Sequence, residues 1–187
     1  MKRLFYQLIL SSLIVIWSCS QAGDGGQTQT SSLPDNTPKG QASVVDDVSA
    51  KNILQVAMGS EAHTTLVAAV EAAQIEHVLV NAGPLTVFAP TNDAFAALPE
   101  GTVENLLLPE NKGDLATILT RHAAPGSYNV DDLIKNMEKG RTLYMATGDY
   151  LEITQEGEDV FVGGAKIVGT IETSNGIIHV IEQVILP

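Results

Sequence analysis

The sequence has very little of several residue types whose presence would point to a definite class of protein. It contains one cysteine among 187 residues, so no disulfide can form within the chain. Lys and Arg together number 10 against 22 Asp and Glu, which gives a formal net charge of −12 at pH 7. Since no basic stripe is available to displace the counterions of a phosphate backbone, the composition argues against nucleic acid as a partner.

An apolar run long enough to span a membrane is also lacking. The apolar stretch at residues 4–17 is too short to cross a bilayer comfortably as a helix, and the basic residues Lys2 and Arg3 precede it. A basic start followed by an apolar stretch is the layout of a bacterial export signal. We therefore expect residues 1–18 to be a signal peptide that is removed from the mature chain.

The sequence Ile16-Trp17-Ser18-Cys19 resembles the lipobox of bacterial lipoproteins, although Trp17 departs from the small or aliphatic residue that is usual there. The resemblance implies that Cys19 receives a diacylglycerol and becomes the first residue of the mature chain. Two or three acyl chains hold a protein stably on a membrane. The alternative is cleavage by ordinary signal peptidase, with Cys19 incidental. Because Ser20 stands where an aspartate would signal inner-membrane retention, we expect an outer-membrane lipoprotein on the periplasmic or cell-surface face.

The chain after the cysteine changes in composition before any periodic pattern begins. Up to about residue 41 it consists largely of Gly, Gln, Thr, Ser, Asn and Pro, which cannot bury enough apolar surface to offset the entropy of ordering. Residues 19–41 are therefore predicted to be the lipidated cysteine and a disordered tether. Periodicity runs from Ala42 to Pro187, so residues 42–187 are predicted to form one domain.

Helical and strand-like patterns divide this domain into two halves. A helical stripe that includes His77 covers residues 61–80, and further helices are predicted after residue 91, from Thr102 and around 114–121. The strand-like segments of the second half, which glycines separate, are 142–145, 150–154, 160–162, 165–173 and 177–186. Helices first and strands later, with one isolated early strand, predict an α+β fold.

The segment TVFAPTNDAF, residues 86–95, turns abruptly from a predicted strand into a predicted helix. Many hydrolases place a nucleophile at such a corner, so one interpretation makes Thr91 a nucleophile, His122 its base and Asp93 the group that orients the base. In the other interpretation Pro90 ends the strand and the polar residues cap the next helix. No G-x-S-x-G, H-E-x-x-H or phosphate-loop motif accompanies the corner, which favours capping.

Together with NGIIHVIEQVILP, residues 175–187, this segment resembles the paired H1 and H2 motifs of the fasciclin (FAS1) domain family. The segments HTTLVAAVEAA, LPEGTVENLL and ILTRHAAPGSY are similar to intervening parts of the family. The resemblance implies the FAS1 fold, a wedge of two β-sheets with several α-helices packed on one side. The residues of the two motifs are Thr86, Phe88, Pro90, Thr91, Asn92, Asp93, Phe95, Asn175, Gly176, His179 and Val180.

The sequence departs from the family at one informative place. FAS1 domains commonly have Tyr-His before a Pro-Gly turn, whereas this chain has Arg121-His122 there, so a cation replaces an aromatic ring. We expect recognition to use this edge, with Arg121, His122 and Tyr128 as the partner-binding residues. The alternative is structural, with His122 a satisfied core residue and Arg121 lying over apolar surface.

The resemblance implies an exported, membrane-anchored module that binds or adheres to a protein, a glycan or matrix, and that is not an enzyme. The alternative function is a carrier that holds a small apolar ligand, such as a lipid or pigment, in a cleft of the domain. The hydrolase built on Thr91, His122 and Asp93 ranks third.

The histidines and acidic residues predict neither a metal site nor a cofactor. His63, His77, His122 and His179 have no i, i+4 pairing and no cysteine companions. The acidic turn at residues 156–159 lacks the alternating oxygen ligands of a calcium loop, so a solvated hairpin tip is the better interpretation.

Overall fold

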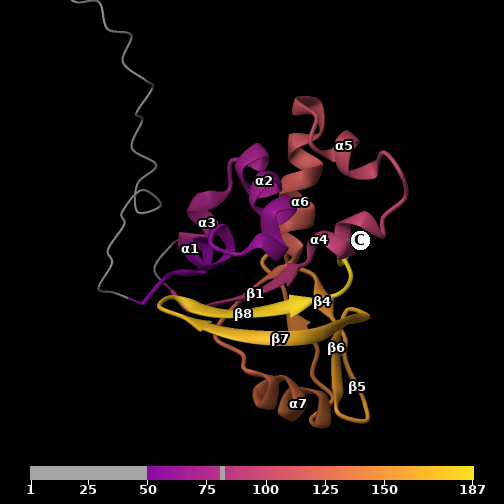
Figure 1. The fold of residues 1–187 in the computed structure, drawn as a ribbon. Coiled ribbons are helices and arrows are strands. Elements are labelled where there is room, and N and C mark those ends of the chain that lie inside the picture. The colour runs from indigo at the N-terminus through magenta and orange to yellow at the C-terminus, as the bar shows by residue number, and fades with distance from the viewer. Residues whose placement is uncertain (1–49, 81–82) are drawn as a thin grey trace, which may run out of the picture. The chain divides into compact units, whose positions relative to one another are not determined.

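A computed structural model of the chain describes residues 50–80 and 83–187 (Figure 1). The predicted signal peptide (1–18), Cys19, the predicted tether (19–41) and the predicted start of the domain at Ala42 lie outside the described residues. Among the helices that are described, none combines the length and the apolar character needed to cross a bilayer.

Most helices lie in the first half of the described chain. In chain order they are α1 (Ile53–Met58), α2 (Thr64–Ala73), α3 (Glu76–Val80), α4 (Asn92–Ala96), α5 (Thr102–Leu106), α6 (Lys112–Arg121) and α7 (Val130–Glu138), with the short 3₁₀ helices η2 (Glu61–His63) and η3 (Pro109–Asn111) before α2 and α6. Side-chain oxygens begin three of them by accepting an N–H of the first turn: Asn52 caps α1, Thr91 caps α4 and Asn129 caps α7.

The strands form two sheets, and together with the helices they confirm the predicted α+β class. The larger sheet has the order β2-β1-β8-β7-β6-β5, and the smaller sheet pairs β3 with β4. The bounds of the strands are β1 (Leu85–Pro90), β2 (Ala123–Pro125), β3 (Leu143–Tyr144), β4 (Tyr150–Leu151), β5 (Ile153–Glu156), β6 (Asp159–Val162), β7 (Ala165–Thr173) and β8 (Gly176–Ile181).

Two predicted elements differ in extent from those observed. The helix predicted over residues 61–80 is interrupted at Gln74, whose left-handed backbone (φ 56°) ends α2. The interruption changes the helical phase, so His77 is exposed and does not continue the apolar stripe. The strand predicted over 177–186 ends at Ile181, because its partner β1 ends opposite that residue, at Pro90.

The larger sheet separates two apolar cores, because side chains alternate between the faces of a strand. Val87 and Ala89 of β1 face a core shared with α1, α2, α3, α4 and α6, while Phe88 between them faces a second core shared with α7 and β3–β6. Figure 1 shows α1–α6 on one side of the sheet and α7 on the other. Phe88 is 0% exposed, and burying such a side chain contributes about 2 kcal/mol.

The hairpin between β7 and β8 approaches β1 very closely. A Cβ atom on Gly176 would lie 1.8 Å from the backbone oxygen of Leu85, so only glycine fits. Next to it, the Asn175 side chain accepts the N–H of Ile53 (3.0 Å) and donates to the oxygen of Leu79 (2.8 Å). The Asn-Gly pair therefore joins the start of β8 to β1 and to two helices.

We predict that Gly176→Ala lowers the free energy of unfolding by about 3 kcal/mol or more, because the new methyl group forces β1 and β8 apart. Gly113→Ala is the matched control, since a Cβ there meets no atom within 4 Å. It should leave the stability unchanged or raise it by up to about 1 kcal/mol. Urea unfolding of both variants measures the difference, and equal stabilities would contradict the assigned contact.

Candidate functional site

The corner at residues 90–93 fastens two helices to the sheet. The Thr91 hydroxyl accepts the N–H of Ala94 (3.2 Å) and so begins α4. Asn92 accepts the N–H of Thr65 (3.0 Å), in the first turn of α2, and its amide donates to the oxygen of Glu61 (2.9 Å). Asp93, also predicted to cap, is exposed, and no hydrogen bond to its side chain is found within the described residues.

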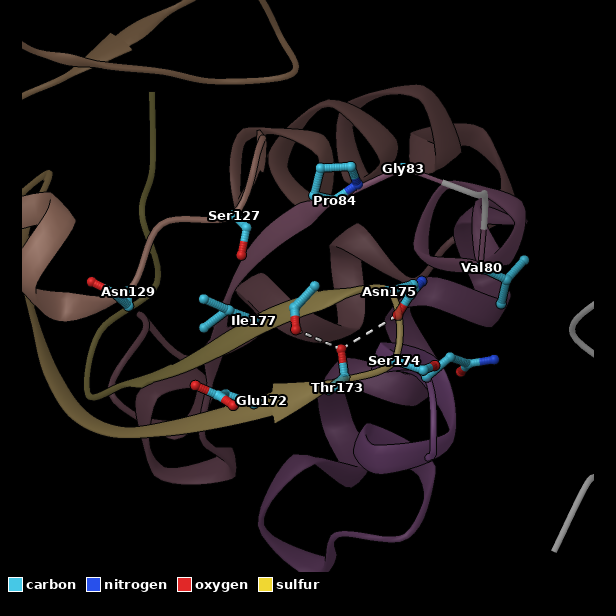
Figure 2. Close-up of a pocket in the computed structure, with 12 residues that line it drawn as sticks. Val80, Gly83, Pro84, Ser127, Asn129, Glu172, Thr173, Ser174, Asn175 and Ile177 are labelled. Carbon is cyan, nitrogen blue, oxygen red and sulfur yellow. Dashed lines mark hydrogen bonds between the residues drawn. The ribbon is translucent and has the colours of Figure 1, made fainter. Parts of the chain in front are cut away.

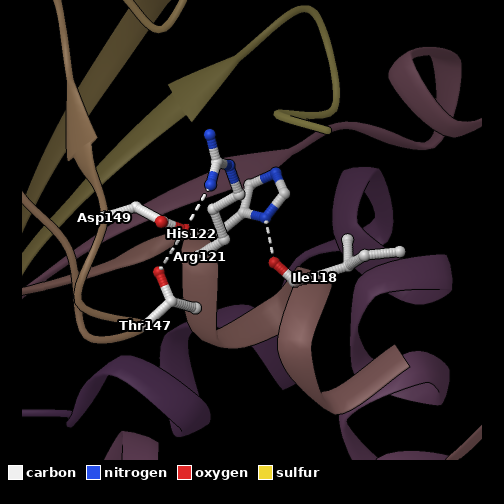
Figure 3. A network of polar contacts seen from close by, with 5 residues as sticks. All are labelled: Ile118, Arg121, His122, Thr147 and Asp149. Carbon is white, nitrogen blue, oxygen red and sulfur yellow. Dashed lines mark hydrogen bonds and ion pairs between the residues drawn. The ribbon is translucent and has the colours of Figure 1, made fainter. Parts of the chain in front are cut away.

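His122 is locked in the interior by the backbone. Its ring is 2% exposed, Nδ1 donates to the oxygen of Ile118 (2.8 Å; Figure 3), and Nε2 accepts the N–H of Ile185 (2.9 Å). Burial lowers the pKa of His122 to about 4. The hydrogen bond to the Ile118 carbonyl raises this pKa, and the charge of Arg121 lowers it further. With both nitrogens engaged, the ring has no free position from which to deprotonate Thr91 or to contact a partner.

Arg121 fastens the connection between β3 and β4 to the end of α6. Its Nη1 forms an ion pair with Oδ2 of Asp149, and the Thr147 hydroxyl donates to the same oxygen (3.0 Å; Figure 3). The Arg121 side chain is only 17% exposed, compared with 51% for Asp149. The cation expected to face a partner is thus largely covered and neutralised.

The Thr86 side chain of β1 holds the turn at residues 123–128 against the sheet through two hydrogen bonds. The Thr86 hydroxyl donates to the oxygen of Gly126 and accepts the N–H of Tyr128, both at 2.9 Å. A Cβ on Gly126 would lie 2.9 Å from the Tyr128 ring, so glycine is needed where the ring lies over the turn. Tyr128, the third predicted contact residue, is half-buried and packs against the second core.

His179 of β8 forms a further hydrogen bond to the same turn. The ring is 0% exposed, stacks on Phe88 with centroids 5.4 Å apart, donates from Nε2 to the oxygen of Tyr128 (2.8 Å) and accepts the Thr170 hydroxyl at Nδ1 (2.9 Å). Burial lowers its pKa. Thr86 and His179, two polar residues of the H1 and H2 motifs, thus hold the strands and the turn at residues 123–128 together.

Sequence reasoning missed the most exposed aromatic side chains of the described chain. Tyr144 and Tyr150 face each other across the β3–β4 ribbon with ring centroids 5.3 Å apart, and they are 46% and 66% exposed. Their neighbours Leu143 and Leu151 point inward and are buried. The signal was present in YMATGDY, where two tyrosines flank a polar turn in strand-like segments.

Several backbone contacts hold this ribbon rigidly. The N–H of Met145 donates to the oxygen of Asp149 (2.8 Å), and the N–H of Ala146 donates to the oxygen of Ala123 (2.7 Å), beside His122. Met145 itself is 0% exposed. Together with the ion pair of Arg121, these contacts connect the ribbon that carries the two tyrosines to β2 and to the end of α6.

The cavities of the described residues differ in size and polarity. A polar hollow of about 770 Å³ lies beside the β7–β8 turn, where Asn52, Ser127, Asn129 and Glu172 line it (Figure 2). The side chains of Asn52 and Asn129 cap helices, and they are not free to bind a ligand. The apolar cavity between α1, α2 and the sheet measures about 10 Å³, less than one water molecule needs.

No group of three or more His, Cys, Asp and Glu side chains that could hold a metal ion occurs within residues 50–80 and 83–187. His63 is buried and pairs through Nδ1 with the Ser60 hydroxyl (2.8 Å). In the acidic turn, Asp159 forms an ion pair with Lys166 (2.8 Å).

Comparison with known proteins places the chain in a family. The sequence profile of the Fasciclin domain matches residues 61–187. Protein sll1483 of the cyanobacterium Synechocystis sp. is 49% identical over 140 residues, which cover 74% of this chain and 75% of that protein. Immunogenic protein MPB70 of Mycobacterium bovis is 32% identical over 155 residues, which cover 80% and 76%. Transforming growth factor-beta-induced protein ig-h3 of Sus scrofa is 33% identical over 138 residues, which cover 72% and 19%.

A solved FAS1 domain pair from the insect cell adhesion molecule Fasciclin I is similar with a TM-score of 0.48 and 20% identity, over 64% of this chain and 44% of that one. The family match covers more than half of the sequence and includes both motifs. The chain therefore belongs to the fasciclin family, and its fold is the FAS1 fold that the two motifs predicted.

We predict that the protein loses stability as the pH falls from 7.5 to 5. The pKa of His122 is lowered to about 4 from an ordinary value of 6.5, and burial also lowers the pKa of His63 and His179. Below pH 6.5 the unfolded chain therefore binds more protons than the folded one, and the stabilisation present above that pH is lost. For His122 alone the loss by pH 5 is about 2 kcal/mol.

Urea unfolding at several pH values between 7.5 and 5 measures this loss. His122→Gln is the matched control, because glutamine can donate and accept hydrogen bonds but does not titrate. The variant should be less stable than the wild type at pH 7.5 and should depend less on pH. A wild-type free energy of unfolding that stays constant over this range would contradict the prediction.

Proposed function

We propose that the chain is an exported, membrane-anchored binding module that attaches through the Tyr144–Tyr150 ribbon to a protein, glycan or matrix partner outside the cytoplasm. The observation that carries the proposal is the pair of exposed aromatic rings on a braced ribbon. Membership of the fasciclin family supports a binding role, as the resemblance of the two motifs implied.

The physical case rests on exposure and preorganisation. Tyrosine is enriched in the centres of recognition surfaces, because a rigid ring buries much apolar area while its hydroxyl still forms hydrogen bonds. Ordering mobile side chains and loops costs free energy on association, and the contacts from Arg121 and Ala123 to this ribbon reduce that cost. In this proposal Arg121 positions the surface, whereas sequence reasoning made it a contact.

The two other functions receive less support from the same residues. A carrier of a lipid or pigment needs an enclosed apolar cavity of several hundred Å³, whereas the apolar cavity between the helices and the sheet is about 10 Å³. The hollow of about 380 Å³ beside α4 and α5 is lined by Glu100 and Glu104 as well as by apolar side chains. A hydrolase needs a base with a free nitrogen, and both nitrogens of His122 are bonded to backbone groups. We therefore propose binding without catalysis.

We predict that Tyr144→Ala combined with Tyr150→Ala reduces attachment of cells carrying the protein on the order of tenfold, because two interface aromatics are lost. Since both rings are largely in solvent, the melting temperature should change little. Leu107→Ala with Leu108→Ala is the matched control, since it removes exposed apolar side chains elsewhere on the domain. The proposal fails if both double variants attach like the wild type, or if they lose attachment equally.

We predict that Cys19→Ala moves the protein out of the membrane fraction, either unprocessed or soluble. The acyl chains expected on Cys19 stabilise membrane binding by about 0.8 kcal/mol per buried methylene group, and an acidic chain gains no attraction to anionic lipids. Fractionation with immunoblotting measures the change, and Ser18→Ala is the control that keeps the cysteine. Unchanged membrane partition of Cys19→Ala would refute lipid anchoring, and outer-membrane placement is tested by the same fractionation.

A further inference from the structure

Strand β7 has a long edge that no described strand covers. On one side it pairs with β8 from Ile167 to Thr173, with a register shift between Ile167 and Gly169, but on the other side it pairs with β6 only at Ala165 and Lys166. Seven residues, 167–173, therefore face no neighbour on that side among the described strands. Such an edge is a template for pairing with another extended chain.

The backbone groups along this edge follow from the hairpin that ends β7. Two residues connect β7 to β8, so Thr173 and Gly176 close the hairpin as a hydrogen-bonded pair. Since bonded and non-bonded pairs alternate in a regular antiparallel ladder, Glu172 and Thr170 direct their N–H and C=O groups away from β8. The register shift between Ile167 and Gly169 interrupts this alternation at Val168.

The side chains leave this edge open to solvent on both faces. Thr170, Ile171 and Glu172 are consecutive and all exposed, although consecutive side chains point to opposite faces. Val168 is 46% exposed and Ile171 is 39% exposed, so two large apolar side chains lie in solvent here.

The other edge strands of the larger sheet are protected in ways that β7 is not. β2 is three residues long and ends in Pro125, which has no N–H to donate. β5 is four residues long and ends in Glu156. Short length, proline, charge and bulges are the usual means by which sheets prevent pairing at their edges. The register shift between Ile167 and Gly169 interrupts only the first part of the β7 edge, and residues 169–173 stay regular. The open part of β7 has no proline and one charged residue, Glu172.

We propose that this edge pairs with the same edge of a second copy of the chain, as antiparallel strands related by a twofold axis at Thr170. This register places Thr170 opposite its own copy, Val168 opposite Glu172, and Gly169 opposite Ile171. Threonine pairs and β-branched side chains are favourable across neighbouring strands. A twofold interface of this kind is closed and uses one surface twice.

Charge favours this arrangement over parallel stacking of the same strands. In the antiparallel register the two Glu172 side chains lie four residues apart along the strands, which is about 14 Å and longer than the Debye length of about 8 Å at physiological salt. In a parallel, in-register pair they would lie about 5 Å apart and repel. The edge is thus electrostatically compatible with its own copy only in the antiparallel sense.

Disulfide trapping of the full chain tests the register. Opposite residues of a bonded antiparallel pair have Cα atoms about 5.5 Å apart, which a disulfide spans. Thr170→Cys places the new thiol opposite its own copy and should therefore give a covalent dimer under mild oxidation. Glu172→Cys is the matched control and should stay largely monomeric, because in this register its thiol faces Val168 of the second copy and lies about 14 Å from the other new thiol. Equal trapping in the two variants, or none in Thr170→Cys, would overturn the proposal.

Sedimentation of the full chain, extracted in mild detergent, tests the interface without cross-links. Val168→Glu places a like charge opposite Glu172 of the second copy and should raise the dissociation constant of the dimer on the order of tenfold. Thr154→Glu, which adds the same charge at an exposed position on edge strand β5, is the matched control and should change it little. A chain that is monomeric at all concentrations, or a dimer that both glutamates weaken equally, would refute the proposal.

The salt dependence gives a further readout. The net charge of −12 repels a second copy, whereas backbone hydrogen bonds between strands are little affected by salt. Raising NaCl from about 0.05 M to about 0.5 M should therefore strengthen the dimer; weakening would indicate an interface of ion pairs and contradict strand pairing. These experiments do not use attachment as a readout, so their failure leaves the proposed role of the tyrosines untouched.

Discussion

The parallel pairing of β1 with β8 is the contact on which the rest of the structure depends. Leu85 pairs with Gly176, which is 176 − 85 = 91 positions later, and no short turn can make such a parallel connection. The intervening chain includes β2 and β5–β7, which are strands of the same sheet, together with α4–α6 on one face and α7 with the β3–β4 ribbon on the other. The close approach at Gly176 and the stack of Phe88 on His179 fix the register of this pair.

Two buried histidines extend this constraint to the loops. His122 holds the C-terminal segment through Ile185, and His179 holds the turn through Tyr128. A buried polar ring is costly unless its nitrogens are bonded, and each of these rings has a backbone group as a partner. Of the three residues that resemble a catalytic set in the sequence, Thr91 and His122 are therefore used by the fold, whereas Asp93 is exposed.

The sequence was most informative where local chemistry determines structure. The α+β class and the capping role of Thr91 at the corner follow from periodicity, proline and capping residues. The break at Gln74 was missed because a left-handed glutamine carries no signal of its own and is held by packing. The ion pair between Arg121 and Asp149 was missed because Asp149 lies 28 residues away and meets Arg121 only through the tertiary fold. The tyrosine ribbon was missed because β3 and β4 are two residues each, too short for a periodic pattern.

The two proposed surfaces belong to different sheets, and this separation has a consequence for binding. The tyrosines lie on the β3–β4 ribbon, whereas the open edge is in the six-stranded sheet. Pairing at β7 therefore buries no residue of the β3–β4 ribbon, and a twofold dimer carries two copies of this ribbon. When both copies reach partners on one surface, the second contact forms at a high effective concentration, and the combined affinity exceeds that of one ribbon without any new contact. Under these two proposals, an acidic module with a small recognition surface gains attachment strength through self-pairing.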